Sequence, residues 1–328
     1  MTRPVTLHEI EVAQKQISAH VLRTPLRASL ALSERAGVAV YLKLENHQRT
    51  GSFKLRGATN AILRLDQGRR SRGLITASTG NHGRAVAYAA KALGARAMIC
   101  MSTLVPANKV EAIRHLGAEI HTAGRSQDDA MLEAEHLVRQ KGMYFVPPFD
   151  DAAVIAGQGT LGLEIASDLP KTAVVLVPLS GGGLASGVAA AIKGRRSSAR
   201  IVGVSMERGA AMAASLAAGV PTNVQEVETL ADSLGGGIGL DNRLTFQMCR
   251  DLLDDVILLG EEEIAAGIHH AARIEGETVE GAGAVGIAAL LARKVKADGP
   301  LVVVVSGGNI DPVAHRAIVD GYQSGEAR

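Results

Sequence analysis

The sequence contains no tryptophan, and aromatic residues make up only 2% of its 328 positions. A core with so few rings must be built from aliphatic side chains, as in valine-rich parallel strands covered by helices. Proteins that bind single-stranded nucleic acids stack bases on aromatic rings and carry a basic excess. The formal net charge here is +2. We therefore expect a small-molecule partner and no nucleic acid.

Cysteines and uninterrupted apolar segments are also scarce. Cys100 and Cys249 are the only cysteines, too few for a disulfide scaffold. The N-terminus lacks the apolar region of a secretory leader. Residues 172–192 carry no charge, but Pro178 and three glycines interrupt them, which argues against a membrane-spanning helix. We expect a cytoplasmic protein without membrane spans.

Residues 73–150 show a repeating strand–helix pattern. Short apolar runs begin near residues 73, 95, 119 and 143. The helix-like stretches between them end at Gly94, Gly117 and Gly142, where left-handed helix caps are expected. Each step has room for one strand and one helix. The pattern predicts a small four-stranded parallel unit.

A second, longer α/β region surrounds this unit. Its expected strands are 40–45, 173–179, 201–205, 256–259 and 301–305. We expect an α/β protein of two parallel-sheet domains. Residues 1–72 and 151–328 would form a large domain, and residues 73–150 a small domain inserted into it. A ligand crevice between the two domains would follow.

Two glycine-rich segments have different contexts. Ser180–Leu184, with three consecutive glycines, follows an expected strand and opens an expected helix, which favours phosphate binding over a plain turn. Gly281–Gly286 matches the dinucleotide pattern G-x-G-x-x-G. The preceding residues 268–280 look helical and polar where that motif requires a strand, so we reject the nicotinamide interpretation.

Three further segments carry side chains suited to catalysis or ligand binding. Lys54 stands between Phe53 and Leu55, an apolar setting that lowers the pKa of a lysine and favours the neutral amine that carbonyl chemistry needs. Residues 78–83 (S-T-G-N-H-G) lie between a strand and a helix and could cradle a carboxylate, although an ordinary helix cap is an equal alternative. Ser306 follows the apolar strand 301–305, at the strand end where α/β sheets place ligands.

In this order, the segments resemble the threonine/serine dehydratase family of fold type II pyridoxal-phosphate enzymes, which share a tryptophan synthase β-like fold. The matching motifs are G-S-F-K-L-R-G-A (51–58), S-T-G-N-H-G (78–83), P-L-S-G-G-G-L (178–184), E-G-A-G-A (280–284) and S-G-G-N (306–309). The resemblance spans nearly the whole chain.

The resemblance implies pyridoxal 5′-phosphate as cofactor and elimination of water from a β-hydroxy amino acid, giving a 2-oxo acid and ammonia. Lys54 would hold the cofactor and then act as the base for the substrate α-proton. Phe53 would pack near the cofactor ring, Asn81 would bond its 3′-oxygen, and Ser306 would face its pyridine nitrogen. The implied phosphate ligands are the N–H groups of Gly181, Gly182, Gly183 and Leu184. The implied carboxylate ligands are Ser78, Thr79, Gly80 and His82.

Some positions depart from the family pattern. Members that bind a structural cation carry acidic residues where this sequence has Ser205 and Ala211, so we expect no metal site. The Thr79 hydroxyl, as a second catalytic group, leaves racemization of serine or hydroxyaspartate open. Residues 233–242 resemble the dehydratases of hydroxyectoine utilization, and the substrate could then be a hydroxyectoine-derived compound.

Three other functions compete with the dehydratase interpretation. β-Replacement is a further reaction of the same fold. A non-catalytic binding protein has no need for a Schiff-base lysine such as Lys54. A metal hydrolase built on His269, His270 and Glu275 is disfavoured because adjacent helical side chains point about 100° apart. Family members are commonly dimers or tetramers, so we expect a homo-oligomer.

Overall fold

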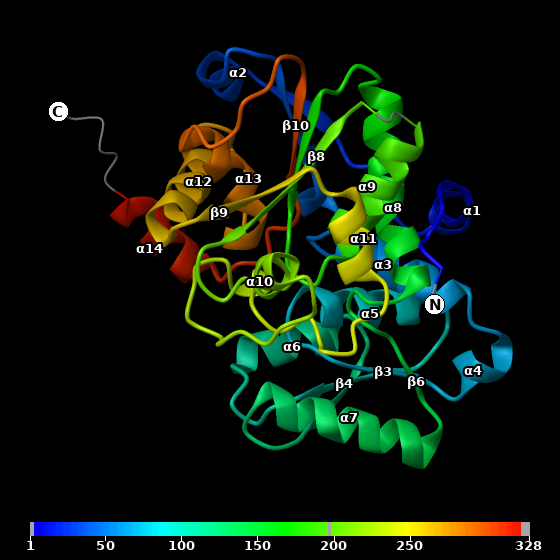
Figure 1. Ribbon diagram of the computed structural model, residues 1–328. Helices are drawn as coiled ribbons and strands as arrows, with labels where there is room; N and C mark the ends of the chain where they lie inside the picture. Colours follow the sequence, from blue (N-terminus) through cyan, green and yellow to red (C-terminus); the bar gives the residue numbers. More distant parts are fainter. Residues whose placement is uncertain (1–2, 196–197, 323–328) are drawn as a thin grey trace.

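Two β-sheets organise the chain, of which the computed structural model describes residues 3–195 and 198–322. The larger sheet has the strand order β1-β2-β10-β7-β8-β9, and the smaller has the order β5-β4-β3-β6. Figure 1 shows the smaller sheet, with β3, β4 and β6, below the larger one, with β8, β9 and β10. Strand β1 is antiparallel to β2, and the other recorded pairs are parallel. The strands are β1 (Leu26–Ser29), β2 (Val40–Leu44), β3 (Leu74–Ala77), β4 (Ala97–Met101), β5 (Glu119–Thr122), β6 (Tyr144–Phe145), β7 (Val174–Pro178), β8 (Arg200–Met206), β9 (Asp255–Leu259) and β10 (Leu301–Val305).

Helices connect the strands and cover both sheets. The helices are α1 (Leu7–Ile17), α2 (Leu30–Ala36), η1 (Glu45–His47), α3 (Lys54–Leu63), α4 (Gln67–Ser71), α5 (Asn81–Ala92), α6 (Ala107–His115), α7 (Gln127–Lys141), α8 (Ala152–Asp168), α9 (Gly183–Arg195), α10 (Ala211–Ala218), η2 (Asp232–Leu234), α11 (Thr245–Leu252), α12 (Glu261–Arg273), α13 (Gly281–Leu291) and α14 (Pro312–Gly321). The α/β class with parallel sheets is as the sequence predicts.

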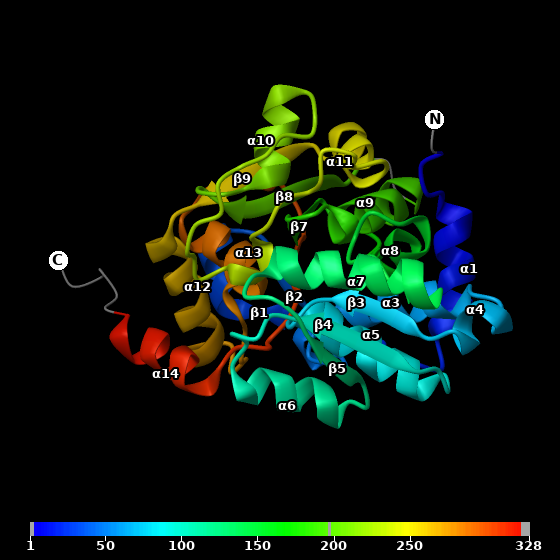
Figure 2. The same cartoon turned by 90° about the horizontal axis from the view of Figure 1, so that it is seen from below.

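The larger sheet is buried on both faces. In β10, Leu301, Val303 and Val305 pack in one apolar cluster with residues of α12 and α13. The intervening Val302 and Val304 pack in another cluster with residues of α8 and α9. Figure 2 shows these helix pairs on opposite sides of the sheet. Because side chains alternate along a strand, burial on both faces requires the unbroken apolar run of β10.

The smaller sheet follows the same rule. Leu74 of β3 packs with residues of α3 and α5. Its neighbour Ile75 faces the other way and packs with Ala130, Ala134 and Leu137 of α7. The strands of this sheet lie between residues 74 and 145, whereas those of the larger sheet lie in 26–44 and 174–305. Domain boundaries at 72/73 and 150/151 stay a prediction.

Glycines end several helices. Gly94, Gly117 and Gly142 have φ angles of +66°, +96° and +64°, which confirms the left-handed caps that the sequence indicates. The expected helix 268–280 is wrong in its second half. Helix α12 ends at Arg273, and Gly276 adopts a φ of +71°. Residues 274–280 therefore form an irregular connection to α13.

The uncharged stretch 172–192 forms β7, a glycine turn and most of α9. Within residues 3–195 and 198–322, we find no helix with the length and apolarity needed to span a bilayer.

Candidate active site

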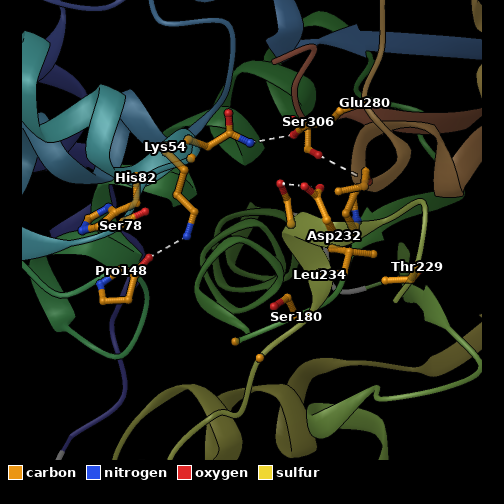
Figure 3. A pocket seen from close by; sticks show the side chains of 18 of the residues that line it. Lys54, Ser78, His82, Pro148, Ser180, Thr229, Asp232, Leu234, Glu280 and Ser306 are labelled. Carbon is orange, nitrogen blue, oxygen red and sulfur yellow. Dashed lines mark hydrogen bonds between the residues drawn. The ribbon is translucent and has the colours of Figure 1, made fainter. Parts of the chain in front are cut away.

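A cavity of about 900 Å³ lies where β3, β7 and β10 end. Its walls come from both sheets: Figure 3 shows Lys54, Ser78, His82 and Pro148 on one side, and Asp232, Glu280 and Ser306 on the other. Every site residue that the sequence suggests lines it, namely Phe53, Lys54, Ser78, Thr79, Gly80, Asn81, His82, Gly181, Gly182, Gly183, Leu184 and Ser306. Convergence of strand ends on one cavity is the usual arrangement of α/β ligand sites.

Lys54 is the first residue of α3, and the chain before it is fixed to the end of β10. The Phe53 N–H donates to the Ser306 carbonyl at 3.0 Å, and Ser52 forms a β-bridge with Gly307. The Lys54 Nζ donates to the Pro148 carbonyl at 2.8 Å (Figure 3). Burial lowers the pKa of Lys54 to about 8, although the charge of Glu280 raises it in part. The amine is therefore available in its neutral form just above neutral pH.

The glycine turn after β7 leaves its N–H groups free. In the described chain, the N–H groups of residues 181–184 donate to no other residue. They lie at the start of α9, where the helix dipole favours an anion. Side chains would not fit: a Cβ on Gly181 would lie 2.4 Å from the Phe149 ring, and Gly182 has a φ of +86°. The turn therefore fits a phosphate group.

The loop between β3 and α5 presents polar groups to the same cavity. Asn81 and His82 begin α5, and Ser78 and Thr79 precede it. The His82 Nε2 donates to the Val146 carbonyl at 2.8 Å, and burial lowers the pKa of His82 to about 3. A neutral His82 adds no charge, so the loop offers hydrogen bonds and a helix N-terminus to an anion.

A buried ion cluster fixes the helix that carries Lys54, because Arg56 lies on the same helix. Arg56 is 1% exposed, and its guanidinium donates to Glu45 at 2.8 Å and to Glu164 at 2.7 Å. Lys43, also buried, pairs with Glu164. Burial opposes ionisation of Glu45, but the charge and hydrogen bonds of Arg56 hold the pKa of Glu45 below its usual value. The cluster joins α3 to η1 and α8.

Several lining residues are absent from the sequence-based site. The Pro148 carbonyl accepts from Lys54, and the Phe149 side chain lies against the glycine turn. Glu280 accepts a hydrogen bond from Asn81. Asp150 does not line the cavity, but its carboxylate accepts from the N–H groups of residues 243–245 and so caps α11. Glu280 had two signals in the sequence: it opens the matching motif E-G-A-G-A (280–284), and it is the only charged residue between positions 279 and 291.

The rejected metal constellation does not gather around one point. His269 packs against the ring of Tyr322, with centroids 5.0 Å apart, whereas His270 lies 3.4 Å from Glu275. Ser205 and Ala211 are buried. Within the described residues, we find no group of three His, Cys, Asp or Glu side chains placed to hold a metal ion.

Comparison with known proteins places the chain in a family. Residues 17–307 match the model of the pyridoxal-phosphate dependent enzymes. The chain is 61% identical over 318 residues to a Sinorhizobium fredii protein provisionally named a threonine dehydratase, covering 97% of this chain and 96% of that protein. It is 43% identical over 307 residues to the L-threonine ammonia-lyase of Thermotoga maritima, covering 94% and 76%. Maize serine racemase has a similar structure, with a TM-score of 0.91, 34% identity and coverage of 95% and 96%.

Proposed function

Because this chain belongs to the pyridoxal-phosphate dependent enzymes, we propose that it is a lyase that removes water from threonine or serine and releases a 2-oxo acid and ammonia. One observation carries the proposal: the amine of Lys54 and the free N–H groups of the glycine turn 181–183 line the same cavity. The cofactor requires both groups, an amine for its aldehyde and hydrogen-bond donors for its phosphate.

Lys54 provides the reactive amine. With a pKa of about 8, part of the Lys54 population is unprotonated at neutral pH, whereas an ordinary surface lysine is almost fully charged. When bound, pyridoxal phosphate makes the α-C–H of an amino acid acidic by delocalising the electron pair. The same Lys54 nitrogen can accept that proton, because a lysine with a lowered pKa serves as a general base.

The cofactor-holding residues provide complementary groups. We assign the phosphate to the N–H groups of residues 181–184, the pyridine nitrogen to the Ser306 hydroxyl and the 3′-oxygen to the Asn81 amide. Ser306 is 3% exposed, and among the described residues its hydroxyl makes only a long contact of 3.5 Å with the Ala282 carbonyl. A hydroxyl, unlike a carboxylate, does not stabilise a proton on the ring nitrogen. Phe53, which lines the cavity, would pack beside the ring.

The substrate carboxylate is assigned to the loop that begins α5. Ser78, Thr79 and Gly80 line the cavity there, and His82 stands in the first turn of the helix. The hydroxyl groups and helix N-terminus favour an anion, and the neutral His82 leaves no competing charge beside Lys54. This arrangement would orient the α-carbon toward the Lys54 amine.

Racemization is a second candidate. Thr79 supplies a hydroxyl in the same cavity as Lys54, and the chain resembles maize serine racemase. Two proton-transferring groups on opposite faces of a substrate are what inversion requires. Product analysis distinguishes the reactions, since elimination gives a 2-oxo acid and ammonia whereas racemization gives the D-amino acid.

The segment 233–242 bears on the identity of the substrate. Ser233, Leu234, Gly235 and Gly236 line the cavity and belong to the segment 233–242, which resembles the dehydratases of hydroxyectoine utilization. A hydroxyectoine-derived compound is therefore part of our proposal beside threonine, serine and hydroxyaspartate. We further propose a cytoplasmic homo-oligomer, since members of the family are commonly dimers or tetramers.

The proposal is tested with Lys54→Ala. The wild-type protein with cofactor should show a visible absorbance band and release 2-oxo acid and ammonia from at least one member of a panel of the four substrate types. Lys54→Ala should lose both. Lys109→Ala is the matched control, because Lys109 lines the same cavity, and it should keep the band. A band that persists in Lys54→Ala would contradict the assignment.

A further inference from the structure

Glu280 is a buried carboxyl group in the cavity wall that the proposed chemistry leaves unused. It is 4% exposed and stands directly before α13, an apolar helix of glycine, alanine and aliphatic residues. Its side chain lies on the same side of the cavity as Ser306 (Figure 3). A buried acid costs free energy unless neighbouring groups satisfy it. Its neighbours therefore indicate what the residue does.

Glu280 is hydrogen-bonded to the cofactor side of the site. The Asn81 Nδ2 donates to Glu280 Oε1 at 2.6 Å. The Asn81 Oδ1 accepts from Asn309 Nδ2 at 2.6 Å, and this same Nδ2 donates to the Thr50 carbonyl at 2.8 Å. Both ends of the Asn81 amide are thus fixed, and one N–H of its Nδ2 remains for a ligand. Gly307 makes room for the carboxyl, because a Cβ there would lie 2.6 Å from Glu280 Oε1.

The charges around Glu280 come from three elements. Lys54 lies on α3, Arg84 on α5 and Asp232 on η2, while the backbone N–H of Asn309, after β10, also acts on the carboxyl. Burial raises the pKa of Glu280 to about 7; Asp232 adds to this effect, whereas the hydrogen bonds from Asn81 and Asn309 and the charge of Arg84 oppose it. Glu280 therefore gains its negative charge near neutral pH.

We propose that Glu280 is a positioning residue of the cofactor site, whose carboxyl group fixes the Asn81 amide and whose negative charge stabilises a positive charge on the Lys54 nitrogen. The inference rests on the proposed function, because it takes Lys54 as the amine that holds pyridoxal phosphate. The Glu280 side chain thus has two separable effects, a hydrogen bond to Asn81 and an electrostatic effect on Lys54. The hydrogen bond needs only an oxygen acceptor, whereas the electrostatic effect needs a carboxylate.

Glu280→Gln tests the charge, because glutamine keeps an acceptor oxygen for Asn81. The measurement is a pH titration of the visible absorbance of the protein with cofactor bound. Removal of the negative charge should make a protonated Lys54 nitrogen less stable and lower the titration midpoint by about one pH unit. Glu277→Gln is the matched control. Glu277 is buried three residues earlier, but it pairs with Arg27 at 2.8 Å and His47 at 2.7 Å, outside the cavity, so its midpoint should equal that of the wild type.

Glu280→Ala tests the hydrogen bond. Alanine leaves the buried Asn81 amide without its acceptor, so the cofactor dissociation constant should rise about tenfold, whereas it should change little in Glu280→Gln. A merely structural residue would lower thermal stability in both variants without moving the titration midpoint in Glu280→Gln.

The outcomes separate this inference from the proposed function. If the wild-type band persists in Lys54→Ala, the cofactor assignment fails. If that assignment holds but Glu280→Gln titrates like the wild type, the inference about Glu280 is overturned. Should Glu280→Gln not fold, the coupling can be measured from the other side, because it is reciprocal. Lys54→Met should raise the titration midpoint of the Glu280 carboxyl in ¹³C NMR spectra of cofactor-free protein, and an unchanged midpoint would equally overturn the inference.

Discussion

Replacing Gly181 with alanine should weaken cofactor binding through a steric conflict with Phe149. The added Cβ would lie 2.4 Å from Phe149 Cδ1, 2.5 Å from Cγ and 2.7 Å from Cε1. Carbon atoms in contact normally lie about 3.5–4.0 Å apart, so the overlap is about 1 Å along a whole edge of the ring. The ring or the glycine turn must therefore move.

The size of the effect follows from the cost of overpacking. An extra methyl group in a well-packed region costs about 1–3 kcal/mol. If the turn moves, its N–H groups leave the positions that we assign to the phosphate, and the same free energy appears as a roughly 5- to 150-fold higher dissociation constant. Titration of cofactor-stripped protein with pyridoxal phosphate, followed by visible absorbance, measures this change.

A second substitution tests the cause. Phe149→Ala removes the ring, so Gly181→Ala should weaken binding less in the Phe149→Ala background than in the wild type, with a coupling free energy of about 0.5–3 kcal/mol. Gly321→Ala is the control, because a Cβ at that helix end meets no atom within 4 Å, and its affinity should be unchanged. Wild-type affinity in Gly181→Ala, or the same loss in both backgrounds, would refute the reasoning.

The sequence predicts the parts of the fold that depend on local patterns. Strand β10 matches the apolar run 301–305 residue for residue, because a strand buried on both faces needs such a run. Gly94, Gly117 and Gly142 mark helix ends because a left-handed cap favours glycine over residues with a Cβ. Fold class follows from the order of these elements.

The region before α13 could not be predicted in this way. Its polar residues fit a helix by pattern, yet α12 stops at Arg273. Glu277 instead bonds Arg27 and His47, 250 and 230 positions away in the chain. Such long-range pairs leave no periodic signal in the sequence, and tertiary contacts override the local helix propensity.

The residues of the candidate site also divide into those with a local sequence signal and those without one. Motif residues at strand–helix junctions, such as Lys54 and Ser306, are recognisable because their chemistry and local context coincide. Pro148 contributes only a backbone carbonyl, and Glu280 meets Asn81 across 199 positions. Their place in the site depends on how the two sheets meet. The roles that the resemblance assigns to the motif residues stay predictions until the variants above are measured.

Two further predictions concern Arg56 and Lys54. Arg56→Met should lower the free energy of unfolding by about 3–5 kcal/mol, because Glu45 and Glu164 lose the buried guanidinium that bonds both. Chemical denaturation checks this, with the exposed Arg250→Met as control, and equal stabilities would contradict it. The rate at which cofactor-free protein binds pyridoxal phosphate should rise as pH increases through about 8, because burial lowers the pKa of Lys54 to that value and only the unprotonated amine attacks an aldehyde. A rate that rises only near pH 10 would mean that Lys54 titrates as a solvated lysine and that the cavity does not desolvate its amine.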